Sequence, residues 1–232
     1  SKKSKFMKIV FRIFFILLLI TPPGFSASPK EIYQKVAPSV GLVSFFQNIS
    51  SDAKIGSYDK IKRYCIGVVV SEDGLVMVTN EVYPVSLDFV SSGSSFLSGL
   101  PSEFKIKLSS GTEYDATFLG KDDQAQVAFI QIERQETSQK FPFITFVSTE
   151  QVQVADSIYL TETLAQNYNF STLFSPLLIN AVIESPKRKF LVNNYSPALS
   201  AGGLVVNTRG EGIGVTINQV FGYKKNVVLS GN

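Results

Sequence analysis

Residues 196–215 read SPALSAGGLVVNTRGEGIGV. Small residues and two consecutive glycines lead into an apolar run at 204–206, and a turn at 207–210 separates this run from a second apolar stretch at 213–217. Glycine, asparagine and short polar side chains favour tight turns, and short apolar runs bounded by such turns favour buried strands. The stretch therefore predicts a loop followed by a β-hairpin.

Composition allows a substantial core and excludes one class of partner. The chain has 232 residues, 44% of them hydrophobic, which fits one two-lobed domain or two small ones. Five of its 22 basic residues precede position 13, where no acid occurs, so 17 basic residues face 19 acidic ones in the remainder, a balance of about −2. A nucleic-acid-binding surface needs clustered basic residues on the folded part. We therefore expect no nucleic-acid partner.

Residues 7–26 predict a secretory signal peptide. A basic start at Lys8 and Arg12 leads to an apolar core at 13–20, and prolines and a glycine precede a cleavage point before Ala27. A membrane anchor is the alternative, but this run is far shorter than the roughly 20 residues that span a bilayer. We expect an exported protein, in the periplasm or cell envelope if the source is bacterial, with membrane contact only through an uncleaved signal.

The ligand-forming residues are few. Cys65 is the only cysteine, so no internal disulfide can form, and the sequence contains no histidine. Zinc sites are built mainly from these two residue types. We expect no metal and no cofactor. The N-x-S sequons at Asn48, Asn169 and Asn194 matter only in a eukaryotic source.

The remaining pattern predicts one short helix and many short strands. The helix begins at a capping box, Ser28 to Glu31, and Pro38 ends it. The turn Glu72-Asp73-Gly74 joins two apolar strands. We predict strands at 40–46, 66–70, 104–108, 114–118 and 126–132 in a first lobe (27–136), with a polar loop at 47–58. In a second lobe (137–232) we predict strands at 152–160, 177–183, 190–192, 204–206 and 213–217. This pattern predicts an all-β barrel or sandwich, and the spacing of the strands alone does not distinguish the two.

Several motifs occur in one order along the chain: S-E-D-G-L with T-N at 71–80, L-S-x-G-x-E-Y-D-A at 108–116, G-x-D at 120–122, V-A-D at 154–156 and G-E-x-I-G at 210–214. Together with the glycine-rich loop they resemble the HtrA/Do-like (DegP-type) family of trypsin-fold serine proteases. The resemblance implies two packed six-stranded β-barrels after the signal and short helix, an active site between the barrels, and trimers in relatives. The PDZ domain that usually follows in relatives is not expected within these residues.

The family's catalytic positions carry other residues here. The resemblance puts the histidine position at Val82, or at Glu81 if the alignment is anchored on the preceding turn, and the aspartate position at Gln126. The nucleophilic serine position falls on Ala201, or on Ser200 in a register shifted by one. Acyl transfer by this family needs an imidazole that takes the serine proton and returns it to the leaving amine. The sequence supplies none.

Three functions follow from this pattern. The first is a pseudoprotease that binds polypeptide clients or a partner protein in the cleft between the barrels, by pairing an extended peptide with a strand edge as a chaperone or scaffold. That cleft is expected at Leu199, Ser200, Ala201 and Gly202, where Leu199 replaces a glycine of the oxyanion loop. The alternatives are a serine endopeptidase, in which Ser200 is the nucleophile rather than a solvated loop serine, and a structural envelope protein.

Overall fold

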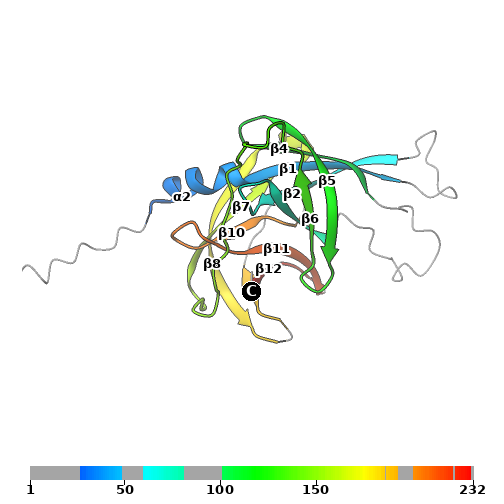
Figure 1. Ribbon diagram of the computed structural model, residues 1–232. Coiled ribbons are helices and arrows are strands. Elements are labelled where there is room, and N and C mark those ends of the chain that lie inside the picture. Colours follow the sequence, from blue (N-terminus) through cyan, green and yellow to red (C-terminus); the bar gives the residue numbers. More distant parts are fainter. Residues whose placement is uncertain are drawn as a thin grey trace, which may run out of the picture.

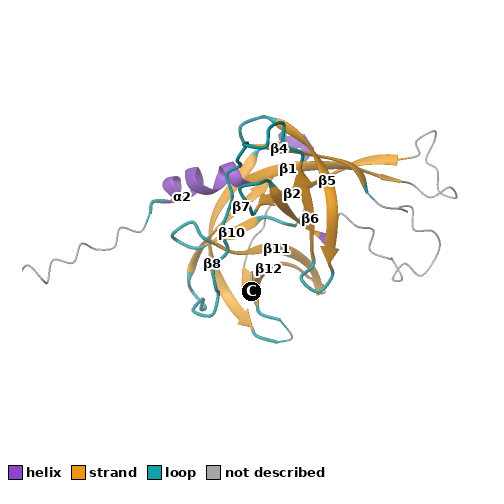
Figure 2. Ribbon diagram, in the orientation of Figure 1, coloured by secondary structure: helices purple, strands orange, loops and turns teal. Residues whose placement is uncertain are grey.

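The computed structural model describes residues 27–48, 60–80, 101–185, 187–192, 201–221 and 223–230. Strands joined by loops and turns form most of this part of the chain, and one short α-helix lies at its N-terminal side (Figures 1 and 2). The predicted signal at 7–26 lies outside the described residues, as do Glu81, Val82, Leu199 and Ser200. No helix among the described residues is long and apolar enough to cross a membrane.

Helix α2 (Pro29–Val36) begins as its sequence predicts. Glu31 N–H donates to the Ser28 hydroxyl at 3.3 Å, and the Glu31 carboxylate accepts from Ser28 N–H at 2.7 Å, which completes the capping box. A 3₁₀ turn (Ala37–Ser39) continues the chain into the first strand. Ile32 and Val36 are almost fully buried, so the helix packs one face against the barrels.

The first barrel consists of strands β1 to β6, closed in the order β1-β2-β3-β6-β5-β4. Its strands are β1 (Val40–Asn48), β2 (Lys60–Val69), β3 (Leu75–Thr79), β4 (Ser102–Leu108), β5 (Glu113–Asp122) and β6 (Val127–Ile132). Alternating residues of these strands fill the interior with β-branched and aromatic side chains, as in other small closed barrels. Val43, Phe45, Ile106 and Ile130 are each at most 1% exposed.

The second barrel repeats this strand order. Its members are β7 (Ser157–Thr163), β8 (Thr172–Ile183), β9 (Lys189–Val192), β10 (Leu204–Val206), β11 (Gly212–Phe221) and β12 (Tyr223–Ser230). They close as β7-β8-β9-β12-β11-β10, the order of the first barrel with each number raised by six. Ile158, Leu160, Ile179 and Phe190 form its core. The prediction of two six-stranded barrels is confirmed.

A third apolar cluster joins the barrels. It contains Ile32 and Val36 of α2, Ile66 and Val68 of β2, and Leu204 and Val206 of β10, all buried. Lys35 at the helix end donates to Arg209 O at 2.8 Å, so the helix also contacts the β10–β11 turn. The end of β2 in one barrel and the short strand β10 of the other therefore share one core.

Several strand bounds differ from those predicted. The strand predicted at 152–160 begins only at Ser157, because Ala155 is left-handed and the guanidinium of Arg188 holds the preceding turn by donating to Glu150 O and Val152 O. β2 begins at Lys60 rather than at 66, because β1 continues to Asn48, into the loop expected at 47–58, and pairs there with the polar start of β2. β8 likewise begins at Thr172, where β7 pairs with it.

Candidate functional site

The glycine loop that precedes β10 is held onto β11 by Thr216. Gly202 N–H donates to Thr216 O at 2.8 Å and also lies 3.2 Å from the Thr216 hydroxyl oxygen, which accepts from Gly203 N–H at 2.9 Å. Gly202 has a φ of +103°, a region that favours glycine. Ala201, in the nucleophile position, is 5% exposed. These contacts fix the main chain immediately after that position.

The same loop touches the first barrel where β3 ends. A Cβ placed on Gly202 would lie 3.3 Å from both Ile66 O and Thr79 Cγ2. Thr79 is 2% exposed, and its hydroxyl has no hydrogen-bond partner in the described part of the chain. The histidine position follows Thr79 by two or three residues, at Glu81 or Val82, outside the described residues. The structure thus brings the Ala201–Gly202 end of the loop to the strand that leads to that position.

Gln126, in the aspartate position, lies on the other side of the same strand end. Its carbonyl accepts from Asn80 N–H at 3.0 Å, and its side chain is half-buried. Gln126 is left-handed, with φ of +55°, which is uncommon for a residue other than glycine. The ammonium of Lys187, from the β8–β9 turn of the second barrel, donates to the carbonyl of Gln124 two residues earlier. The aspartate position is therefore held from both barrels.

A ring contact also crosses between the barrels. Tyr64 of β2 and Phe170 of the β7–β8 loop have ring centroids 4.8 Å apart. Asn169 and Phe170 are both left-handed, with φ of +54° and +52°. For a bulky residue such as phenylalanine this is a strained conformation that the surrounding contacts must hold. The loop therefore presents the Phe170 ring to the first barrel at the cost of backbone strain.

Two residues beside the glycine loop were missed from the sequence. Glu162 of β7 is only 2% exposed, and a Cβ on Gly203 would lie 2.6 Å from its Cγ. In sequence it looks like one member of an alternating strand, Thr161-Glu162-Thr163, and nothing local marks it as buried. Nothing in the sequence marks Thr216 either, because it holds the glycine loop only once β11 has paired with that loop.

The sequence assigns Ala201 to the nucleophile position, or Ser200 in a register shifted by one, and Gln126 to the aspartate position. The Ala201 methyl group cannot attack a carbonyl, and the neutral Gln126 amide cannot stabilise an imidazolium as a carboxylate does. Among the described residues no cluster of three or more His, Cys, Asp or Glu side chains could hold a metal ion. The described part of the site thus has a methyl group and a neutral amide at the two predicted positions, and Ser200, the alternative nucleophile, lies outside the described residues.

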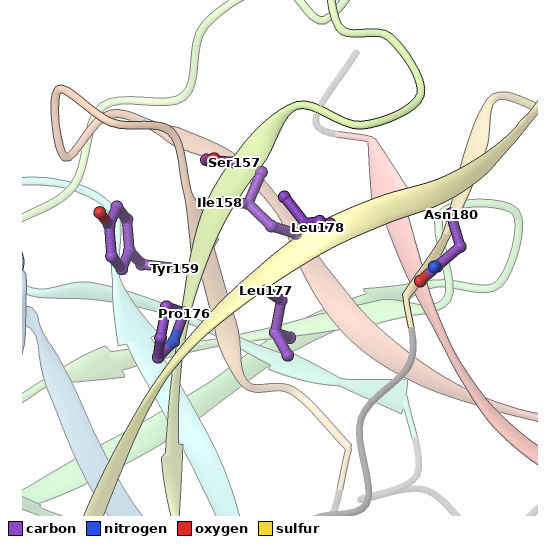
Figure 3. Close-up of a pocket in the computed structure, with 7 residues that line it drawn as sticks. All are labelled: Ser157, Ile158, Tyr159, Pro176, Leu177, Leu178 and Asn180. Atoms are coloured by element: carbon purple, nitrogen blue, oxygen red, sulfur yellow. The ribbon is translucent and has the colours of Figure 1, made fainter.

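A separate hollow of about 380 Å³ lies on the β7–β8 pair (Figure 3). Tyr159 and Pro176 are register partners in it, as are Ser157 and Leu178. Its lining residues are Ser157, Ile158, Tyr159, Pro176, Leu177, Leu178 and Asn180. Neither Ala201 nor Gln126 belongs to this lining.

Comparison with known proteins agrees with this geometry. Residues 65–215 match the family described as the trypsin-like peptidase domain. A "Probable periplasmic serine endoprotease DegP-like" of Rhizobium meliloti (strain 1021) is 30% identical over 90 residues, which cover 39% of this chain and 14% of that protein. The crystal structure of Deg5 superposes with a TM-score of 0.62 at 16% identity, covering 86% of each chain.

Two closed barrels of one strand order, with the glycine loop of the second against β3 of the first, define a trypsin-fold protein. The family match spans well over half of the chain. This chain belongs to the trypsin-like peptidase domain family, and its relatives are of the HtrA/DegP type. The resemblance predicted from the motifs is confirmed, whereas the loss of the triad stays a prediction, because its histidine position lies outside the described residues.

Proposed function

We propose that this chain is an exported, non-catalytic member of its family that binds extended polypeptide as a chaperone or scaffold. One observation carries the proposal. Ala201 stands in the nucleophile position next to an intact Gly202–Gly203 loop, in a sequence without histidine. Without an imidazole, neither Ser200 nor a serine at 201 has the usual base to accept its proton.

The edge of β11 beside this loop supports peptide binding. β10 pairs with β11 only from Gly212 to Val215, and the last contacts across this side are Thr216 N–H to Gly203 O at 2.9 Å and Gly202 N–H to Thr216 O at 2.8 Å. Beyond it, among the described strands, residues 217–221 pair with β12 alone. Their other main-chain side can add an extended peptide as a strand beside the glycine loop. Peptide affinity would come from the main chain, which does not need the triad.

Two assays test the proposal. Purified protein should not react with a fluorophosphonate probe or cleave casein, and it should slow the aggregation of thermally unfolded citrate synthase at stoichiometric amounts. Probe labelling or casein cleavage that Ser200→Ala abolishes would establish a serine endopeptidase, the activity in the name of the DegP-like relative. Absence of both cleavage and aggregation suppression, with one partner recovered after crosslinking, would favour the structural envelope protein.

Export and assembly belong to the same proposal and have their own tests. N-terminal sequencing of the protein from its native envelope should give a start at Ala27, after removal of residues 7–26. Light scattering on that mature form should give the mass of a homo-oligomer, a trimer if the family resemblance extends to assembly. A monomer would leave the peptide-binding proposal standing and remove only its oligomeric part.

A further inference from the structure

The outer side of β2 is an open strand edge. β2 pairs with β1 without interruption, from Lys60 opposite Asn48 to Val68 opposite Val40. On its other side β3 pairs only with Gly67 to Val69. In the ranges that the structure describes, no strand pairs with this side of residues 60–64. Figure 1 shows the paired ends of β1 and β2 extending past the other strands of the first barrel.

The main chain of this edge points outward at known residues. Val70 N–H donates to Leu75 O at 2.8 Å, so the polar groups of residue 70 face the β3 side. The side toward which the main-chain N–H and C=O groups point alternates from one residue to the next along a strand. The N–H and C=O groups of Lys62 and Tyr64 therefore face the β3 side too. The position of Ile66 O is consistent with this alternation, because the atom lies 3.3 Å from the Cβ position of Gly202 on the β3 side. Among the described strands, none uses these donors and acceptors, which recur at two-residue intervals along the edge.

The charge along this edge is positive. β1 and β2 together contain no acidic residue and carry Lys60, Lys62 and Arg63. Lys60 pairs with the Glu103 carboxylate, and Arg63 donates to Gln47 Oε1 at 3.0 Å. No acidic side chain of the described residues pairs with Lys62, whose ammonium lies 6.0 Å from the Phe46 ring and 5.6 Å from the Tyr64 ring.

Side chains two apart on a strand share a face, so Lys60, Lys62 and Tyr64 lie in one row. The Tyr64 end of this row is apolar, because Phe170 packs against Tyr64 there. A strand laid along the edge would find cations opposite one half and an aromatic platform opposite the other. Lysines on an open edge also discourage two copies from pairing through it, while they attract a strand of opposite charge.

We propose that the edge of β2 from Lys60 to Tyr64 binds an extended acidic polypeptide segment by adding it as a strand. Carboxylates at alternate positions of that segment meet Lys60 and Lys62, and an apolar side chain at its end meets Tyr64 and Phe170. This surface is separate from the edge of β11, and it does not depend on whether the cleft binds peptide or whether the protein is an enzyme.

The test uses a fluorescein-labelled ten-residue peptide of alternating Glu and Val, titrated with the full chain and followed by fluorescence anisotropy. Lys62→Gln should weaken binding about threefold to fivefold, the range of an exposed ion pair. Lys62→Pro removes the same charge and also the outward N–H, without touching the pairing to β1, and should weaken binding by on the order of tenfold or more. Lys30→Gln, at an exposed site on α2, should leave binding unchanged.

A second measurement keeps the test decisive if Lys62→Pro does not fold. The same peptide, N-methylated at alternate residues, keeps its charge and loses the main-chain donors on one side, so at least one of its two methylation registers should bind about tenfold more weakly. Equal loss in Lys62→Gln and Lys62→Pro, or unchanged binding of both methylated peptides, would overturn strand addition. Equal affinity for a single-stranded dT20 oligonucleotide would show a general polyanion surface, and no binding by the unaltered protein would end the proposal.

Discussion

Replacing Ala155 by glycine should raise the free energy of unfolding. Ala155 lies in the turn before β7 with φ of +72°, and its N–H donates to Ile179 O at 2.8 Å. A left-handed conformation costs a residue with a Cβ about 1–2 kcal/mol, a cost that glycine avoids. Val154-Ala155-Asp156 also stands where the resembling family has V-G-D, so the substitution restores the residue that this turn geometry favours.

The expected gain in the free energy of unfolding is the difference between two opposing effects. Relief of the left-handed strain contributes about 1–2 kcal/mol, and the greater freedom of glycine in the unfolded chain removes about 0.4–1 kcal/mol. The net gain is about 0.5–1 kcal/mol. For a chain of this size each kcal/mol moves the melting temperature by about 2–4 °C, so Ala155→Gly should melt about 1–4 °C higher.

The matched control is Ala165→Gly in the β7–β8 loop. Ala165 has φ of −66° and ψ of 169°, an ordinary extended conformation. Glycine there relieves no strain and should lower stability by about 0.4–1 kcal/mol. Urea unfolding and thermal melting, both followed by circular dichroism, would compare the two variants. If Ala155→Gly loses stability as Ala165→Gly does, no strain is stored at residue 155 and the reasoning is refuted.

Three further predictions concern the glycine loop and its turn. Gly203→Ala should lower stability by about 1–3 kcal/mol in urea unfolding, because its Cβ would meet Glu162 Cγ at 2.6 Å; unchanged stability would contradict this packing. Ala201→Ser should give no fluorophosphonate labelling, since a serine without an imidazole stays protonated; labelling would contradict it. Hydrogen bonds from Asn207, and then from Arg209, hold the pKa of Glu211 below its ordinary 4.5. A lowered folded-state pKa contributes stability above pH 4.5 that is lost as the pH falls below it, so Glu211→Gln should lose less stability in that acid range, and an identical acid profile would argue against it.

Local features of this fold could be predicted from the sequence because neighbouring residues determine them. The capping box at Ser28 and the turn at Asn207 are examples. In that turn the Asn207 side-chain oxygen accepts from Arg209 N–H at 2.8 Å and from Glu211 N–H at 3.1 Å. Such contacts span two to four residues, and residue type alone favours them.

Features that depend on distant partners could not be predicted. Glu162 is buried because β10 and the glycine loop cover it, and Gln126 is left-handed where the β5–β6 turn meets the end of β3. Glu162 reads as an ordinary polar position in sequence, and the assignment of Gln126 to the aspartate position says nothing of its backbone conformation. β7 begins later than predicted for the same reason, since an alanine at 155 does not itself favour a positive φ, and Arg188, which holds the turn, lies far along the chain.

The glycine motif that most clearly relates this chain to peptidases is explained by packing alone. Gly202 has a positive φ and approaches Ile66 O and Thr79, and Gly203 has no room for a side chain beside Glu162. Both glycines are required to bring β10 against β7 and the loop against β3, whether or not a nucleophile precedes them. The motif is therefore evidence for the two-barrel fold. Evidence for catalysis would have to come from a nucleophile at position 200 or 201 and from a base that activates it, and the sequence has Ser200, Ala201 and no histidine.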